Sequence, residues 1–186
     1  MAFGLLITRN DIIKNTPLGG AIDADALLPF IRTAQEKYIL NILGTVLYNK
    51  LQDDVEAGTA FTGYYQTLVE EHVKPTLIWY SCVEYIPFSS VQFKSAGAVK
   101  QQSETGIAPS KNEVDYLLSK ALNNADYYST RMQDYLIANN ANLPEYNQST
   151  GDSTMIYPDQ SNQYFGGIQR KISMRILCYL TSVRCL

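Results

Sequence analysis

The chain has 186 residues, 46% of them hydrophobic, which is enough for one globular domain, or for one domain with an extended appendage. Charged residues make up only 18%, below the roughly 25% usual for soluble domains, and the 14 tyrosines favour a surface that contacts other protein, although tyrosines at the rim of the core explain their number equally well. The net charge of −3 argues against a nucleic-acid-binding protein.

The cysteines and the apolar segments argue against disulfide-rich, zinc-binding, secreted and membrane-spanning proteins. Cys82, Cys178 and Cys185 cannot all pair within one chain and none lies in a CxxC unit, so we expect neither a disulfide scaffold nor a zinc site, and a reducing cytoplasm as the setting. The apolar run at residues 3–7 is too short for a signal peptide, and the most apolar stretch, residues 76–91, is shorter than the roughly 20 residues that span a bilayer. We expect no membrane span.

Apolar residues at helical spacing predict two helices in the first third of the chain. The first follows Asp23 or Asp25, either of which suits the N-cap because a carboxylate is stabilised at the positive end of a helix. Gly44 stops or bends this helix, and the second one runs from Val46 to Gly58.

A third helical stretch is predicted from Tyr64 to Tyr85. Pro75 lies inside it and predicts a kink or a break, since proline removes a backbone hydrogen bond and crowds the preceding turn. Pro87 is expected to close the stretch.

Residues 94–110 have few apolar anchors and predict a loop or a two-stranded excursion, that is, a β-hairpin. Ser110 with Glu113 forms a capping-box pattern at the start of a fourth helix, whose apolar positions continue to Leu136 and which ends at Asn139. The predicted fold class is therefore mainly α, a small bundle of about four helices.

The C-terminal quarter has a different composition. Residues 142–163 are rich in Asn, Gln, Ser and Thr and cannot build a core of their own. From Ile168 to Leu186 apolar residues alternate with polar ones, which predicts a strand-like arm, although Ile172, Ile176 and Leu180 also share a helical face. We therefore expect a helical bundle domain at residues 1–141 and a tether with an extended C-terminal arm at residues 142–186.

The arm has no carboxylate side chain after Asp159 but several cations, so it is suited to pairing with the acidic body of a neighbouring protein. Its apolar surface would then be covered by a second polypeptide. The candidate protein-interface residues are Tyr164, Phe165, Ile168, Arg170, Ile172, Arg175 and Ile176.

The sequence contains no recognisable catalytic motif. We therefore expect no catalytic, cofactor-binding or metal-binding residues, and no enzyme. His72 is the only histidine and lies in a predicted helix beside Glu70 and Glu71, where a histidine packed at the helix edge is the simplest interpretation. The paired carboxylates fit helix caps and solvated faces. The Gly-Gly pairs match no phosphate-binding motif, and Cys82 is expected in the core.

Several segments resemble head–tail connector proteins of tailed bacteriophages. They are Phe30 to Gly44 (FIRTAQEKYILNILG), then Leu47-Tyr48 and Leu51, Tyr64 to Val69 (YYQTLV), and Val73-Lys74-Pro75 running into Trp79-Tyr80. The similarity covers about residues 25–140 and is closest to proteins of crAss-like and other Bacteroides phages.

The resemblance implies a head–tail adaptor in the neck of the virion, made in the cytoplasm of the host bacterium. Members of this class form a ring, usually twelvefold, beneath the portal protein, extend the DNA channel and dock the next neck or tail component. A terminal arm commonly reaches onto the portal or an adjacent subunit. No cofactor is implied, and packaged DNA would need only a weak, sequence-independent contact with a few Lys or Arg side chains.

Two other classes remain as alternatives. One is a cytosolic helical protein-binding module whose C-terminal arm folds back on its own body. The other, which the sequence favours least, is an enzyme without recognisable motifs.

Overall fold

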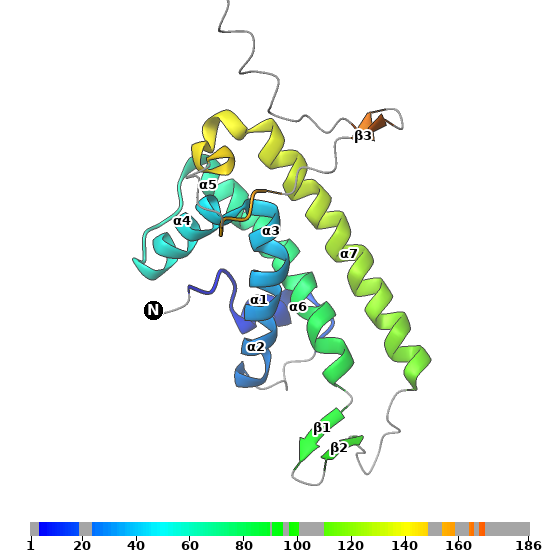
Figure 1. Ribbon diagram of the computed structural model, residues 1–186. Coiled ribbons are helices and arrows are strands. Elements are labelled where there is room, and N and C mark those ends of the chain that lie inside the picture. Colours follow the sequence, from blue (N-terminus) through cyan, green and yellow to red (C-terminus); the bar gives the residue numbers. More distant parts are fainter. Residues whose placement is uncertain are drawn as a thin grey trace, which may run out of the picture.

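The computed structural model describes residues 4–18, 24–89, 91–94, 97–100, 110–148 and 154–158, together with the strand residues 164–165 and 168–169. Within these residues the chain is mainly α-helical, as predicted, and its helices form a small bundle (Figure 1). The α-helices are α1 (Arg9–Asn15), α2 (Ala24–Ala34), α3 (Leu40–Leu43), α4 (Thr45–Glu56), α5 (Gly63–Thr67), α6 (Lys74–Ser89) and α7 (Lys111–Ala138).

The first predicted helix is one continuous rod, in which the π-helical turn η1 (Gln35–Ile39) joins α2 to α3. The rod ends at Gly44, as predicted. Gly44 has φ 75°, a left-handed conformation that costs glycine little because it has no Cβ atom. A Cβ atom at Gly44 would also lie 2.7 Å from Pro158 Cδ. Gly44 therefore both ends the rod and makes room for a later segment of the chain.

The third predicted stretch is a second continuous rod, with the π-helical turn η2 (Leu68–Val73) between α5 and α6. The turn ends two residues before Pro75, where a kink or break was predicted. A π turn shifts backbone hydrogen bonding by one residue, and this irregularity is one way a helix accommodates a proline without breaking. The prediction that Pro87 closes the helix is wrong, because α6 continues to Ser89. Pro87 lies in the last turn, where only one hydrogen bond is lost and the Ser89 hydroxyl donates to Ile86 O at 2.7 Å.

A β-hairpin follows α6 at the lower end of the bundle in Figure 1. Its antiparallel strands are β1 (Val91–Lys94) and β2 (Gly97–Lys100), with Val91 opposite Lys100. The hairpin therefore begins three residues before the predicted excursion at 94–110, and residues 101–109 lie outside the described part of the chain.

Helix α7 begins with the predicted capping box. Ser110 N donates to Glu113 Oε2 at 2.7 Å and Glu113 N donates to Ser110 Oγ at 3.4 Å. The short 3-10 turns η3 (Asn140–Asn142) and η4 (Pro144–Asn147) follow the helix.

The core lies where α6 packs between α2 and α7, with α4 against the far side of the first rod (Figure 1). Fully buried side chains come from each of these helices, for example Leu27, Leu51, Leu77 and Met132. Burying a side chain of this size stabilises the fold by about 1.5–3 kcal/mol. Ala125 is fully buried, and its small side chain lets α7 approach the bundle closely.

The N-terminal segment is held in the body by Gln35, which is fully buried on η1. The Gln35 amide nitrogen donates to Gly4 O at 2.9 Å, and its amide oxygen accepts from Leu6 N at 3.1 Å. The side chain thus satisfies backbone groups that would be costly to bury unpaired.

Packing of the body continues beyond the predicted domain boundary at residue 141. Leu143 and Tyr146 have exposed fractions of 0% and 1% and belong to the core. Further along, Ile156 N donates to Thr45 Oγ1 at 2.9 Å and Thr45 N donates to Ile156 O at 3.0 Å. Of the segment after residue 141, Leu143 and Tyr146 therefore complete the core of the bundle.

Candidate functional site

One face of α7 points away from the core and carries Tyr116, Lys120, Tyr127 and Arg131, which we call the outer stripe. Spacings of four, seven and four residues place these side chains along one line of an α-helix, opposite buried positions such as Ala125. Tyr116 is 61% exposed and Tyr127 is 59% exposed. The outer stripe therefore presents two large aromatic rings to the surroundings.

Each tyrosine of the outer stripe has a cation above its ring. Lys120 Nζ lies 5.5 Å from the Tyr116 ring centroid, and Arg131 Cζ lies 5.9 Å from that of Tyr127. Exposed contacts of this kind are worth about 0.5–1 kcal/mol. Within the part of the chain that the structure describes, neither Lys120 nor Arg131 forms an ion pair with a carboxylate. Both cations are exposed.

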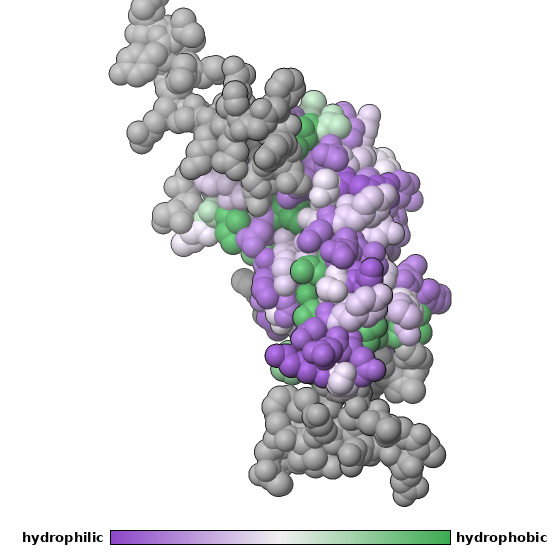
Figure 2. Space-filling model, turned by 90° about the vertical axis from the view of Figure 1, so that its right-hand side faces the viewer, coloured by the Kyte–Doolittle hydropathy of each residue, from purple (hydrophilic) through white to green (hydrophobic). Residues whose placement is uncertain are grey.

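Exposed apolar side chains also occur near the start of α7 and at the end of α6. No residue of the first ten in this helix is buried. Leu117 is 53% exposed and Leu122 40%, and Phe88 at the end of α6 is 46% exposed. Figure 2 looks onto this side of the molecule and shows hydrophobic residues between the hydrophilic ones. Such a mixture of Tyr, Arg and aliphatic side chains is typical of protein–protein interfaces.

A shallow groove with an excess of carboxylates lies along α4 and η4, and we call it the α4 groove. Its volume is about 470 Å³. Its lining residues are Val46, Asn49, Lys50, Asp53, Asp54, Glu145 and Met155.

Lys50, the cation of the α4 groove, contacts both a carboxylate and an aromatic ring. Lys50 Nζ lies 3.2 Å from Asp54 Oδ2 and 5.0 Å from the Tyr65 ring centroid. The Tyr65 hydroxyl donates to Glu145 Oε2 at 2.5 Å, and burial together with this carboxylate raises the pKa of Tyr65. Asp53 and the nearby Glu56 are exposed and form no ion pair with any described residue. The groove therefore keeps negative charge at its rim.

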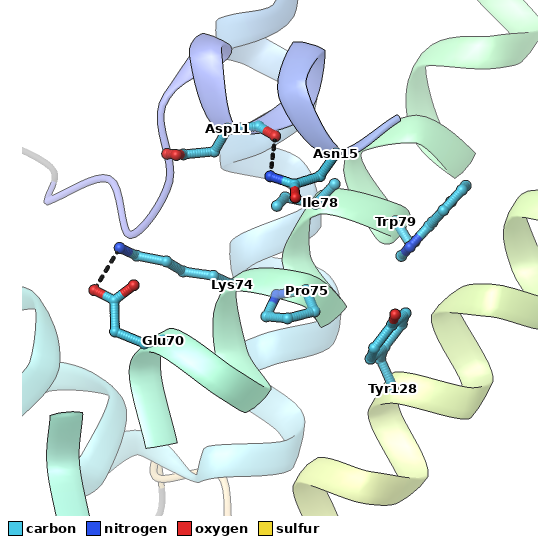
Figure 3. Close-up of a pocket in the computed structure, with 8 residues that line it drawn as sticks. All are labelled: Asp11, Asn15, Glu70, Lys74, Pro75, Ile78, Trp79 and Tyr128. Carbon is cyan, nitrogen blue, oxygen red and sulfur yellow. Dashed lines mark hydrogen bonds and ion pairs between the residues drawn. The ribbon is translucent and has the colours of Figure 1, made fainter. Parts of the chain in front are cut away.

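A second pocket, the Trp79 pocket, lies where α1, η2, α6 and α7 meet and has a volume of about 310 Å³. Figure 3 shows the Trp79 and Tyr128 rings beside each other, one from α6 and one from α7. Its remaining lining residues are Asp11, Asn15, Glu70, Lys74, Pro75 and Ile78. Flat aromatic walls next to a proline and a few polar groups suit a peptide side chain.

The charged groups of the Trp79 pocket already have partners. Lys74 Nζ lies 2.6 Å from Glu70 Oε1 on the adjoining turn (Figure 3). The Asp11 carboxylate accepts from Thr8 N at 2.7 Å and caps α1. Asn15 Nδ2 donates to Asp11 O at 2.8 Å. These side chains are engaged in holding their helices.

His72 is buried at the edge of the bundle, as the sequence predicted. Its ring stacks on Tyr135 with 4.4 Å between centroids, and its Nδ1 atom has no hydrogen-bond partner among the described residues. Burial, and then the positive charge of Arg131, lowers the pKa of His72. A neutral imidazole packed on a tyrosine has a structural role.

Cys82 lies in the core, also as predicted, with an exposed fraction of 2%. Burial raises the pKa of its thiol to about 12, so the reactive thiolate is not populated at neutral pH. Cys178 and Cys185 lie outside the described residues.

The predicted interface residues fall in the C-terminal arm. Tyr164 and Phe165 form β3 (Tyr164–Phe165), and Ile168 belongs to β4 (Ile168–Gln169), with Phe165 opposite Ile168. Arg170, Ile172, Arg175 and Ile176 lie outside the described residues.

The sequence prediction did not include the outer stripe, because the helices were predicted from their apolar positions. Tyr116, Tyr127 and Arg131 fall between those positions. A search for aromatic and cationic residues at helical spacing on the opposite face of the same helix would have found the stripe.

The described part of the chain is a mainly helical bundle. The chain belongs to a family of unknown function, DUF6712, whose profile matches residues 39–154. No curated protein and no solved structure matches it. None of the described helices is both long and apolar enough to cross a bilayer. The described residues also contain no group of three or more His, Cys, Asp or Glu placed to hold a metal ion.

Proposed function

We propose that this chain is a structural virion protein, a head–tail adaptor that forms a ring beneath the portal of a tailed bacteriophage. In this role it extends the DNA channel and docks the next neck or tail component. The resemblance of residues 25–140 to connector proteins supports the proposal. The observation that carries it is the outer stripe, where Tyr116 and Tyr127 are more than half exposed beside cations that form no ion pair with any residue the structure describes.

An exposed tyrosine is useful mainly when a partner covers it. Tyr has few rotatable bonds, so its large ring contributes contact area at little entropic cost. The cation above each ring is already partly ordered, which reduces the entropy lost on binding. A surface of this kind favours repeated contact with other protein, as a ring subunit requires.

The proposal is tested by incubating the full chain with the portal protein of the same phage and analysing the product by electron microscopy and native mass spectrometry. We expect a ring on the portal with about twelve copies, the usual number in the class that the chain resembles. A chain that stays monomeric and does not bind the portal would falsify the proposal.

The Trp79 pocket favours a second candidate, a cytosolic helical module that binds a peptide. Deleting residues 160–186 separates the two functions. If the C-terminal arm folds back on a monomeric module, the deletion lowers the free energy of unfolding. If the chain is an adaptor, the deleted form stays folded and loses only assembly with the portal.

A further inference from the structure

We infer that the outer stripe of one copy docks in the α4 groove of a second copy. The inference rests on the proposed function and names the two faces of the subunit that meet in the ring. Neither face was among the residues expected at an interface from the sequence.

The two faces are complementary in charge. The outer stripe contributes Lys120 and Arg131, both exposed and without a carboxylate partner among the described residues. The α4 groove has three carboxylates and one cation, and Asp53 at its rim is exposed. Opposite charges on two faces of one chain steer copies toward each other and set the register of contact.

The faces also match in their apolar parts. Val46 and Met155 line the groove, so an aromatic ring entering it would meet apolar as well as charged atoms. Tyr127 is the exposed ring of the outer stripe next to Arg131. A ring and a guanidinium one helical turn apart are suited to a groove that has apolar walls and an acidic rim.

The positions of the two faces favour assembly of many copies over a closed pair. Helices α4 and α7 lie at opposite edges of the bundle in Figure 1. A contact between two different faces is heterologous, so each copy can use its stripe on one neighbour and its groove on the other. Such a contact closes into a ring when the rotation between neighbours divides a full turn, and otherwise gives a filament.

Charge reversal on each face gives two matched variants. The stripe variant carries Lys120→Glu and Arg131→Glu, and the groove variant carries Asp53→Lys and Glu56→Lys. A control variant with Lys14→Glu and Lys111→Glu has the same change of net charge as the stripe variant, at exposed lysines off both faces. All replaced side chains are exposed, so each variant should unfold at nearly the wild-type temperature.

Self-association of the full chain is measured by sedimentation velocity at low ionic strength. We expect each face variant to raise the dissociation constant for self-association by about tenfold or more, and the control to leave it within about threefold of wild type. A chain carrying both sets of reversals has a negative stripe and a positive groove, so its association should recover.

Mixing the two face variants is the sharpest arm of the experiment. The groove variant keeps its stripe and the stripe variant keeps its groove, and the two reversed faces are also opposite in charge. The two variants should therefore associate in alternation, although each variant alone associates weakly. An absence of association in the mixture, or a wild-type chain that remains monomeric at its solubility limit, overturns the inference. Binding of the wild-type chain to the portal tests the proposed function separately. If a ring forms on the portal and the face variants form it equally well, the adaptor function stands and the subunits meet through another contact.

Discussion

His72 is a titratable residue whose environment favours the neutral imidazole. It is 8% exposed, its ring stacks on Tyr135 from α7, and the charged groups that act on it are Arg131 from α7 and Glu71 from its own turn. Burial disfavours the imidazolium, and Arg131 repels it. The protonated ring would therefore weaken the contact between η2 and α7.

The lowered pKa predicts a loss of stability in mild acid. Because the folded pKa of His72 lies below its ordinary value of 6.5, the unfolded chain binds more protons between the two values. The contribution to stability is fully present above pH 6.5 and is lost as the pH falls through the folded pKa. We expect the free energy of unfolding, from urea titrations at pH 7 and pH 5, to fall more for wild type than for His72→Phe.

His72→Phe is the matched variant because it keeps a ring against Tyr135 and removes the titrating nitrogen. Carboxylates that titrate below pH 5, such as Glu84 with its lowered pKa, contribute equally to both proteins. An identical fall in the two proteins would exclude His72 as the source.

Helix α7 is the element on which both functional proposals depend. Its C-terminal half is anchored in the core by Met132 and Leu136, whereas none of its first ten residues is buried. Tertiary packing stabilises the N-terminal turns little, so the capping box at Ser110 and Glu113 contributes a large share of their stability. The end of the helix that carries Tyr116 and Lys120 should therefore be the easier one to unfold.

Ser110→Ala should loosen this end of the helix. Loss of the cap costs about 1 kcal/mol, which corresponds to about fivefold faster amide hydrogen exchange in the first two turns of α7. Exchange around Met132 should change much less. Ser119→Ala is the control, since Ser119 lies within the exposed helix and alanine is a better helix former, so exchange should not accelerate there.

The molecule as a whole is closed by a segment that follows the last long helix. Leu143 and Tyr146 fill the core beside α4 and α5, and the Tyr65 hydroxyl donates to Glu145. Residues 154–158 then pair with the start of α4 through Thr45 and Ile156. The part of the chain needed for a stable body therefore extends past residue 141.

Truncation tests where the body ends. A chain of residues 1–141 lacks Leu143 and Tyr146, and burial of two side chains of this size predicts a free energy of unfolding lower by about 3–6 kcal/mol. A chain of residues 1–158 keeps both and should unfold close to the full-length protein. The measurement is thermal and urea unfolding of the three chains, and equal stability of the 1–141 and 1–158 chains would contradict the packing.

Much of the local structure is determined by residues close together in the sequence. Apolar spacing predicted the helical rods, Gly44 predicted the end of the first, and Ser110 with Glu113 predicted the start of α7. Each of these depends on backbone conformation or on hydrogen bonds within a few residues. The prediction at Pro87 failed because a proline in the last turn of a helix costs only one hydrogen bond there.

The sequence by itself determined that this protein is a mainly helical bundle with a buried Cys82 and an edge-packed His72. Only the tertiary structure decided the rest: the π turns, the burial of Gln35 against Gly4 and Leu6, and the use of Leu143 and Tyr146 as core. The α4 groove belongs to this second group, whereas the helical spacing of the outer stripe is present in the sequence. Whether a polar or aromatic side chain is buried depends on which distant segments of the chain pack against it. A local pattern of residues does not specify those contacts.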